Sequence, residues 1–409
     1  MNRKNEKGGL FGKRSSADNK KNHNVNALPK ADAELEAPIP PTEREILVSV
    51  VMPVYNACRY IRPAIESVMA QTLREIEIIC VDDGSTDTSL DMIKIFQASD
   101  DRIRIITETN AGPGIARNNG LKRARGEYVA FLDADDFYEP NMLELLYKAA
   151  KEHDLDIAIA KYDVFDNKKA TFREGSENEN TKIYAGGVVT SKNEYPDHIL
   201  ESTAGAAWNK LFKKSFIYEK GITFLPEVMI FEDVYFTVSA VAFAERIARV
   251  DEVLVHHRMY KQQSRVRTFR KYYPQIPLAF EKTKEFLMKG GIYEPLKRSF
   301  LNLTCTRCHH IYNVLKPDER KIFWNMLHEK YSASLGWDDA IAEDFDKKEI
   351  CEWQANIEMY TFDQFKRRSA KGKELDTENI DRKLKQNKRR KKIREFFAKI
   401  FSRKKKAND

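Results

Sequence analysis

Residues 128–140 read YVAFLDADDFYEP, an apolar run followed at once by three carboxylates. The run from Tyr128 to Leu132 carries no charge, which is typical of a strand buried on both faces of a parallel sheet. Asp133, Asp135 and Asp136 stand where that strand would end. Carboxylates crowded together repel one another unless a cation lies between them, so this stretch predicts both a buried strand and a ligand site at its mouth.

Outward from this stretch, apolar runs alternate with segments of helical spacing. We expect strands within residues 46–52, 75–87, 102–108, 127–133 and 154–165, with Pro53 ending the first of them. We expect helices within residues 60–71, 90–97, 112–125 and 141–153. This alternation predicts an α/β fold with a mainly parallel sheet and helices on both faces.

Three of the expected strands end in polar residues, and ligands of open α/β sheets bind outside the carboxyl ends of the strands. These ends read PVYN from Pro53, VDDGSTD from Val81 and LDADD from Leu132. One such stretch alone could be a turn or a helix N-cap. Two acid-rich ends on neighbouring strands favour a divalent cation, Mg²⁺ or Mn²⁺.

Neither of the two common glycine loops that hold phosphate is present in the sequence. A divalent cation bound by carboxylates and by substrate phosphate oxygens would take the place of those loops. The sequence therefore indicates a ligand that contains a nucleoside diphosphate.

Charge is spread unevenly along the 409 residues, which carry a formal net charge of +8. Residues 382–409 hold 14 Lys or Arg against two acids, and residues 1–30 hold eight against two, which leaves −10 for the body between them. An acidic body argues against nucleic-acid binding, and basic ends indicate contact with an anionic partner. The odd count of five cysteines favours a reducing compartment over a disulfide framework.

Six segments occur in the order and approximate spacing seen in the family 2 glycosyltransferases, which are inverting enzymes with a GT-A fold. They are VSVVMPVYN, ICVDDGSTD, NAGPGIARNNG, GEYVAFLDADD, WNKLF and FEDVYF. The resemblance covers roughly residues 46–265 and implies a transferase that uses a nucleotide-diphosphate sugar, with uracil as the expected base. The segments resemble members of the bacterial surface-polysaccharide type.

The resemblance also implies roles for individual residues of the donor site. Asp135 is the expected metal ligand, with Asp133 as a metal or ribose contact and His257 as a further candidate ligand. Asp136 extends the motif and is expected to cap the helix that follows. The other residues implied to contact the nucleotide sugar are Pro53, Tyr55, Asp83, Arg117, Trp208 and Arg258. Packing in the core is an equal alternative for Trp208, and a helix-surface role is an equal alternative for Arg117.

An inverting transfer needs a base on the side of the sugar away from the leaving nucleotide, to take the proton of the attacking hydroxyl. Asp233 matches the family's base, and Glu232 beside it is expected to support it or to contact the acceptor. An acid pair favoured by a helix dipole is the structural alternative. Two other functions stay open at this stage, a sugar nucleotidyltransferase and a non-catalytic nucleotide-sugar-binding protein.

Three further regions flank or follow the matched part of the chain. We expect residues 1–45 to be a disordered cytosolic arm, 266–380 a helical extension and 381–409 a basic amphipathic tail. In the tail one apolar stripe is flanked by Lys and Arg, as in helices that bind anionic membrane surfaces; it consists of Ile393, Phe396, Phe397, Ile400 and Phe401. The tail predicts an enzyme on the cytoplasmic face of the cell membrane, with a glycan or lipid-linked acceptor.

The segment CTRCHH at residues 305–310 has the spelling of a covalent haem site and could also offer zinc ligands. It lies in a stretch of helical spacing that contains Phe300 and Leu303. Partners for a zinc ion are missing from the flanking sequence, so we expect Cys305 and Cys308 to be ordinary helix cysteines.

Overall fold

The computed structural model describes residues 45–370, apart from residues 168, 176–178, 204 and 260–268. The expectations for the first 44 residues and for the basic tail therefore lie outside the described residues. All of the described residues belong to one compact unit.

The first half of the sheet forms as the alternating pattern predicts. Four strands pair in parallel in the order β3-β2-β1-β4: β1 Val48–Val54, β2 Ile76–Asp82, β3 Ile103–Thr107 and β4 Tyr128–Phe131. The helices between and after them are α1 Ile61–Met69, α2 Ser89–Gln97, α3 Pro113–Arg123 and α4 Met142–Glu152. Alternate residues of β1 pack into two separate cores, which shows that both faces of the sheet are covered.

Pro53 does not end β1, which continues to Val54. The carbonyl of Val51 accepts a hydrogen bond from Leu132, so Pro53, two residues on, faces the same neighbouring strand. That neighbour, β4, has already ended at Phe131. A backbone N–H at position 53 would therefore have no partner on a neighbouring strand. Because proline lacks that N–H, β1 can continue through Pro53 without losing a hydrogen bond of the sheet.

The second half of the nine-stranded sheet is mixed rather than mainly parallel. It contains β5 Phe137–Tyr138, β6 Ile157–Asp166, β7 Thr171–Glu174, β8 Lys210–Lys213 and β9 Ile247–Met259. β8 lies antiparallel between β4 and β6, whereas β6 and β9 run parallel. β5 and β7 are antiparallel additions to β9 and β6.

The remaining elements are helical, and most follow the sheet. The longer helices are α5 Lys214–Glu219, α6 Glu232–Phe243, α8 Ile276–Lys289, α9 Lys297–Val314, α10 Pro317–Met326, α12 Lys348–Met359 and α13 Phe362–Ser369. The short ones are η1 Glu179–Gly187, η2 Ile199–Glu201, η3 Tyr273–Gln275, the π-helix η4 Leu327–Tyr331, α11 Ser332–Ser334, η5 Trp337–Asp339 and η6 Ala342–Asp344.

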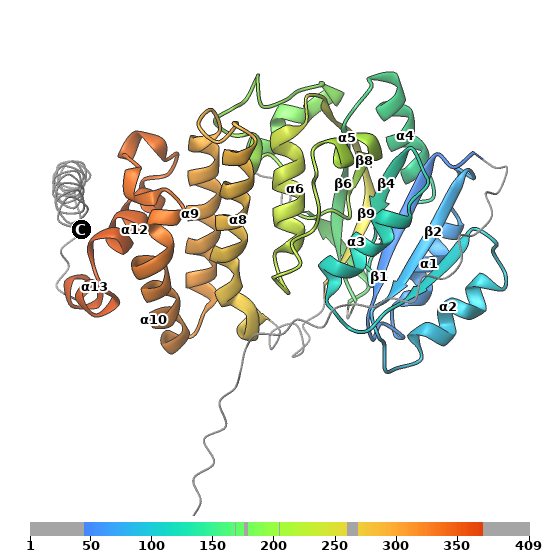
Figure 1. The fold of residues 1–409 in the computed structure, drawn as a ribbon, viewed down its shortest axis with the longest axis horizontal. Helices are drawn as coiled ribbons and strands as arrows, with labels where there is room; N and C mark the ends of the chain where they lie inside the picture. The colour runs from blue at the N-terminus through green and yellow to red at the C-terminus, as the bar shows by residue number, and fades with distance from the viewer. Residues whose placement is uncertain (1–44, 168, 176–178, 204, 260–268, 371–409) are drawn as a thin grey trace, which may run out of the picture. The chain divides into compact units, whose positions relative to one another are not determined.

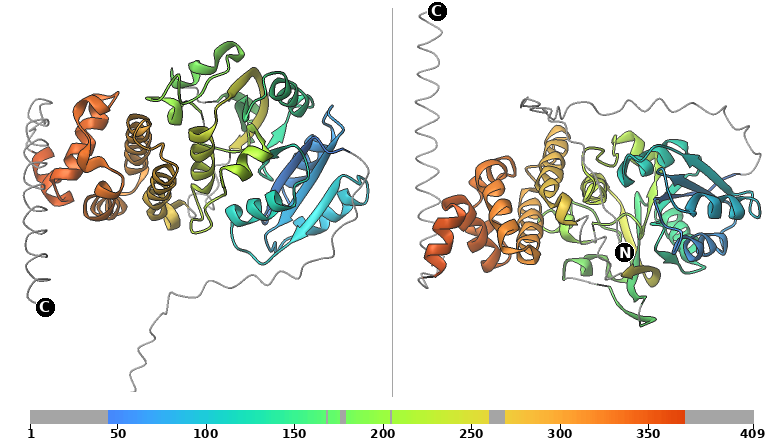
Figure 2. Two further views of the ribbon diagram at one scale, coloured as in Figure 1. Left: turned by 45° about the horizontal axis from the view of Figure 1, so that its top comes forward. Right: turned by 90° about the horizontal axis from the view of Figure 1, so that it is seen from below.

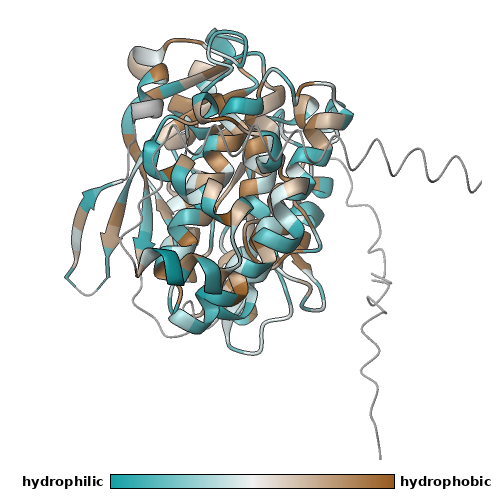
Figure 3. Ribbon diagram, turned by 90° about the vertical axis from the view of Figure 1, so that its left-hand side faces the viewer, coloured by the Kyte–Doolittle hydropathy of each residue, from teal (hydrophilic) through white to brown (hydrophobic). Residues whose placement is uncertain are grey.

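The helical extension shares its core with the sheet domain. α6 stands between the sheet and α8, and α9, α10 and α12 follow farther out (Figures 1 and 2). One hydrophobic cluster runs from Val51 in β1 through Phe236 in α6 to Phe280 and Trp353 in the extension. Hydrophilic and hydrophobic residues alternate along the extension's helices (Figure 3), as they do in amphipathic helices.

Cys305 and Cys308 lie on α9 and are fully buried in the shared core. Burial raises the pKa of both thiols above the ordinary value, and both are free cysteines. The prediction of ordinary helix cysteines is confirmed. Within the described ranges, no helix has the length and apolar character needed to span a membrane.

Candidate active site

The polar strand ends meet at one edge of the sheet, as the parallel order requires. β1 and β4 run side by side, so Tyr55 and Asp133 follow neighbouring strand ends. Asp133, Asp135 and Asp136 each offer a carboxylate oxygen, and these atoms lie within 4.8 Å of one another. Carboxylate oxygens are the ligands that Mg²⁺ and Mn²⁺ prefer, so this cluster fits a divalent cation.

Asp136 does not cap a helix, because β5 follows it and α4 begins only at Met142. Its carboxylate is fully buried and accepts hydrogen bonds from the backbone N–H of Arg258, at 2.8 Å, and from Nδ1 of His257, at 2.9 Å. Burial raises the pKa of Asp136, and the contact with His257 opposes that rise. Asp136 therefore ties the acidic loop to β9.

His257 and Trp208 form a stacked pair beside the acidic cluster. Their ring planes differ by 2° and their centroids are 5.0 Å apart. Trp208 is 8% exposed and also packs edge-on against Tyr162. The core alternative for Trp208 is therefore observed, and a role in stacking on a sugar stays a prediction.

Arg258 is buried behind the acidic loop rather than open to solvent. Its Nε donates to the carbonyl of Asp135 at 2.9 Å, and its guanidinium lies 5.2 Å from the ring centres of both Phe137 and Phe165. Nη1 donates to Asn167 at 2.7 Å. In this arrangement Arg258 supports the loop that carries Asp135.

Arg117 lies on α3 and contacts both acidic motifs. Nη2 pairs with Asp133 at 2.6 Å, and Nη1 pairs with Glu232 at 2.7 Å. The side chain is 7% exposed, which excludes the helix-surface alternative. The proposed donor motif and the proposed base motif, about 100 residues apart in the sequence, therefore meet at one guanidinium.

Asp233 lies in the first turn of α6, directly after Phe231 and Glu232. Phe231 has a φ of 67°, a left-handed conformation that is strained for a bulky residue. Burial, and then the neighbouring charge of Glu232, raise the pKa of Asp233 to about 7, against the opposing charge of Arg117. A carboxylate with such a pKa can accept a proton at neutral pH.

Tyr55 and Asp83 directly follow the ends of β1 and β2 at the same edge of the sheet. Asp83 is buried and accepts backbone N–H bonds from Ala111, at 2.7 Å, and Gly112, at 2.9 Å. Burial raises its pKa, and these two bonds oppose the rise. Tyr55 is 52% exposed, so its ring is available to a flat ligand.

Lys210, two residues after Trp208, is a further residue near the site that the sequence did not predict. Lys210 is fully buried, and its Nζ donates to the carbonyl of Ala206 at 2.7 Å and to the side chain of Asn209 at 2.8 Å. Burial lowers its pKa to about 7, with Asp233 as the opposing charge. A charged residue inside the apolar segment AAWNKLF was the available signal.

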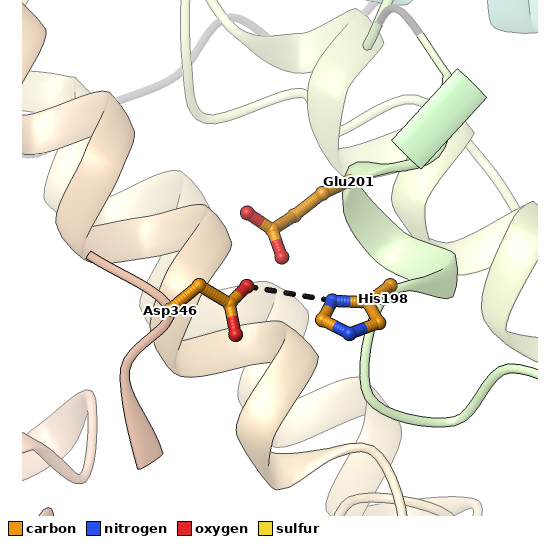
Figure 4. Close-up of side chains that lie close together, drawn as sticks. All are labelled: His198, Glu201 and Asp346. Atoms are coloured by element: carbon orange, nitrogen blue, oxygen red, sulfur yellow. Dashed lines mark ion pairs between the residues drawn. The ribbon is translucent and has the colours of Figure 1, made fainter. Parts of the chain in front are cut away.

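A second group of possible metal ligands lies where η2 approaches the helical extension. His198, Glu201 and Asp346 point toward one another, with Nδ1 of His198 3.4 Å from Asp346 (Figure 4). Arg298 already pairs with Asp346 at 2.9 Å, which supplies a positive charge without a metal ion. We therefore assign these side chains to the contact between the sheet domain and the extension.

Comparisons with known proteins agree with this geometry. A family model described as glycosyl transferase family 2 matches residues 49–214. EpsH of Bacillus subtilis, named as a glycosyltransferase, is 31% identical over 254 residues, which cover 61% of this chain and 72% of EpsH. The poly(ribitol-phosphate) beta-glucosyltransferase of Bacillus spizizenii is 34% identical over 208 residues, or 49% of this chain and 30% of that protein.

The fold is similar to that of S. aureus TarS residues 1–349, solved in complex with UDP-GlcNAc. The two align with a TM-score of 0.60 and 20% identity over 84% of this chain and 92% of that one. This likeness establishes the GT-A fold with a helical region after it. The match to EpsH and the family model, together with the ordered motifs around Asp133 and Asp233, identify the family. The chain belongs to the family 2 glycosyltransferases.

Proposed function

We propose that this enzyme transfers a sugar, with inversion, from a UDP-linked donor to a hydroxyl of a glycan or lipid-linked acceptor during assembly of a cell-surface polysaccharide. The observation that carries the proposal is the pairing of two acidic groups across Arg117, one at the mouth of β4 and one at the start of α6. The first group suits a nucleotide sugar, and the second holds a carboxylate suited to proton transfer.

On the donor side, Asp135 and Asp133 are the proposed ligands of Mn²⁺ or Mg²⁺, with His257 as a further candidate. The three-carboxylate cluster is the support for this choice. A bound divalent cation would supply positive charge against the departing diphosphate. Pro53, Tyr55 and Asp83 would line the base and ribose pocket, because Pro53 lies just before the end of β1 at Val54, and Tyr55 and Asp83 directly follow β1 and β2 at the same edge.

On the acceptor side, Asp233 is the proposed base. The acceptor hydroxyl loses its proton to the Asp233 carboxylate while its oxygen bonds to the anomeric carbon. The bond from that carbon to the diphosphate oxygen breaks on the opposite side, and the nucleoside diphosphate leaves with the electron pair. Glu232 is held by Arg117 and supports the position of Asp233.

The relatives support the substrate class at a coarse level. One matched protein is named for glucosyl transfer to poly(ribitol-phosphate), and the TarS structure holds UDP-GlcNAc. The first name concerns a polymer acceptor and the second a nucleotide-sugar donor. Both suit the substrate classes proposed for this site. The basic tail adds a second proposal, peripheral attachment at the inner membrane face, which would bring a lipid-linked acceptor within reach.

The test is transfer from a panel of nucleotide sugars in the presence of Mn²⁺ or Mg²⁺. Asp233→Asn should lower the rate of transfer by about 10²- to 10⁴-fold, the usual contribution of a general base, while UDP affinity stays within about threefold. Asp91→Asn, at an exposed position of α2, is the matched control and should transfer normally.

Loss of UDP affinity in Asp233→Asn would contradict its role as base. UDP binding without transfer by the wild-type chain would favour a non-catalytic binding protein. Formation of a nucleotide sugar from a sugar phosphate and a nucleoside triphosphate would favour a nucleotidyltransferase. Activity that survives removal of divalent cations by a chelator would contradict the metal-dependent form of the proposal.

A further inference from the structure

Arg117 is held by packing against neighbouring residues as well as by its two ion pairs. Its guanidinium lies 5.3 Å from the ring centre of Phe224, and the next residue, Asn118, exchanges two 2.8 Å hydrogen bonds with the backbone of Phe224. A Cβ placed on Gly114 would lie 3.0 Å from Cγ of Glu232, so α3 and the start of α6 are in close contact. The position of Arg117 relative to Glu232 is therefore set by packing as well as by charge.

Three carboxylates surround this single cation. Desolvation disfavours the charged guanidinium, but Asp133, Glu232 and Asp233 outweigh it and raise the pKa of Arg117. Arg117 is thus charged at every pH at which the protein is folded. Both of its outer nitrogens already bind carboxylates, Asp133 and Glu232, while its Nε is buried and has no hydrogen-bond partner among the described residues.

We propose that Arg117 is a positioning residue that couples the donor side of the site to the base, and that it is not a nucleotide ligand. It orients Asp133 with one nitrogen and Glu232 with the other. Its charge also favours the ionised form of Asp233, the form that accepts a proton. This inference rests on the proposed function, in which Asp233 is the base.

The charges that face Asp233 come from four elements. Glu232 precedes it on α6, Arg117 faces it from α3, and Asp133 lies on the loop after β4. Lys210 faces it from β8. Arg117 is the charge that lowers the pKa of Asp233 against Glu232 and Asp133, so removing it should raise that pKa further.

The test compares Arg117→Met and Arg117→Lys with the wild-type enzyme. Arg117→Met should reduce kcat by about 100-fold, a typical cost of a misplaced catalytic group, while UDP affinity stays within about threefold. The acidic limb of its kcat/KM–pH profile should move upward by about one pH unit or more, because an opposite charge has been removed from the base. Arg117→Lys keeps the charge and should recover most of the pH shift but only part of kcat.

Arg104 offers a control, since it is a partly buried arginine in an ion pair with a buried carboxylate. Arg104 pairs with Glu77 at 2.8 Å on strands β3 and β2, and its side chain is 19% exposed. Arg104→Met should lower thermal stability as Arg117→Met does, yet leave the pH profile unchanged. A pH shift of equal size in both variants would reduce Arg117 to a structural residue and overturn the proposal.

Two other outcomes would also overturn it. If Arg117→Met loses UDP affinity and recovers kcat at saturating donor, Arg117 is a nucleotide ligand after all. If kcat falls while the profile keeps its midpoint in every Arg117 variant, the guanidinium does not act on Asp233. Failure of the proposed function is separate, because it would appear as absence of transfer by the wild-type chain with every donor.

Discussion

Asp233, the proposed base, lies in surroundings that disfavour its charged form. Its pKa is raised to about 7 in the folded protein, above the ordinary 3.8 of an aspartate. Between these values the folded state binds more protons than the unfolded state, so stability falls as pH rises from about 4 to about 7. The Asp233 carboxylate therefore lowers the free energy of unfolding at neutral pH.

Asp233→Asn removes that loss, and we expect the variant to be more stable than the wild type at pH 8 but not at pH 4. The gain should be on the order of 2 kcal/mol once partial exposure is allowed for. Urea unfolding at both pH values measures it, with Asp91→Asn, at an exposed position of α2, as the control. A stability difference that is the same at pH 4 and pH 8 would contradict a raised pKa at this position.

Residue types at strand ends could be predicted from the sequence, but their partners could not. Asp133 and Asp135 were identified by motif and do share a cluster. Asp136 carries the same charge in the same motif, yet its buried carboxylate binds His257 and Arg258, which lie 121 and 122 residues later in the sequence. The local sequence does not distinguish the three carboxylates. They differ because His257 and Arg258 of β9 bind Asp136.

At the level of elements, α8 packs against the start of α6, the helix that carries the proposed base. Phe231, in its left-handed conformation just before Glu232, packs edge-on against Phe280 of α8, with ring centres 6.1 Å apart. Phe280 is fully buried, whereas Met288 on the same helix is 59% exposed. The strained start of α6 is thus stabilised by a contact from the helical extension.

Phe280→Ala should cost about 3–5 kcal/mol of unfolding free energy, as large-to-small changes in a core do. Met288→Ala on the exposed face should change it by no more than about 0.5 kcal/mol. Denaturant unfolding of the two variants gives the comparison. Equal small effects would mean that α8 is not anchored to the sheet domain through this side chain.

The elements that sequence patterns failed to predict share a physical cause. Apolar runs predicted β1, β2 and β4 because each is buried on both faces, whereas β3, which stands at the end of the strand order, is only partly buried. β5 has two residues and β7 is fully exposed, so neither presents a buried run. β8 lies antiparallel within the motif AAWNKLF, and a short apolar stretch does not reveal the direction in which its strand will pair.

For the whole molecule, the basic tail remains the feature whose role depends on a partner outside the chain. A tail of this composition should bind an anionic membrane with roughly 1 kcal/mol for each basic residue near the surface. The apolar stripe that includes Phe396 and Phe401 would enter the interface and add area to that attraction. If the tail binds the membrane through its charges alone, high salt should abolish the binding. If the apolar stripe also inserts, high salt should reduce the binding only in part.

Flotation with vesicles of anionic and of neutral lipid separates these contributions. The full chain should float with anionic vesicles, and a chain ending at residue 385 should remain in the lower fraction, because it lacks both the stripe and most of the basic residues of the tail. Phe396→Ser with Phe401→Ser keeps every charge and should float only at low salt. If the shortened chain floats as the full chain does, the tail is not the anchor, and another surface of the chain must bind the vesicles.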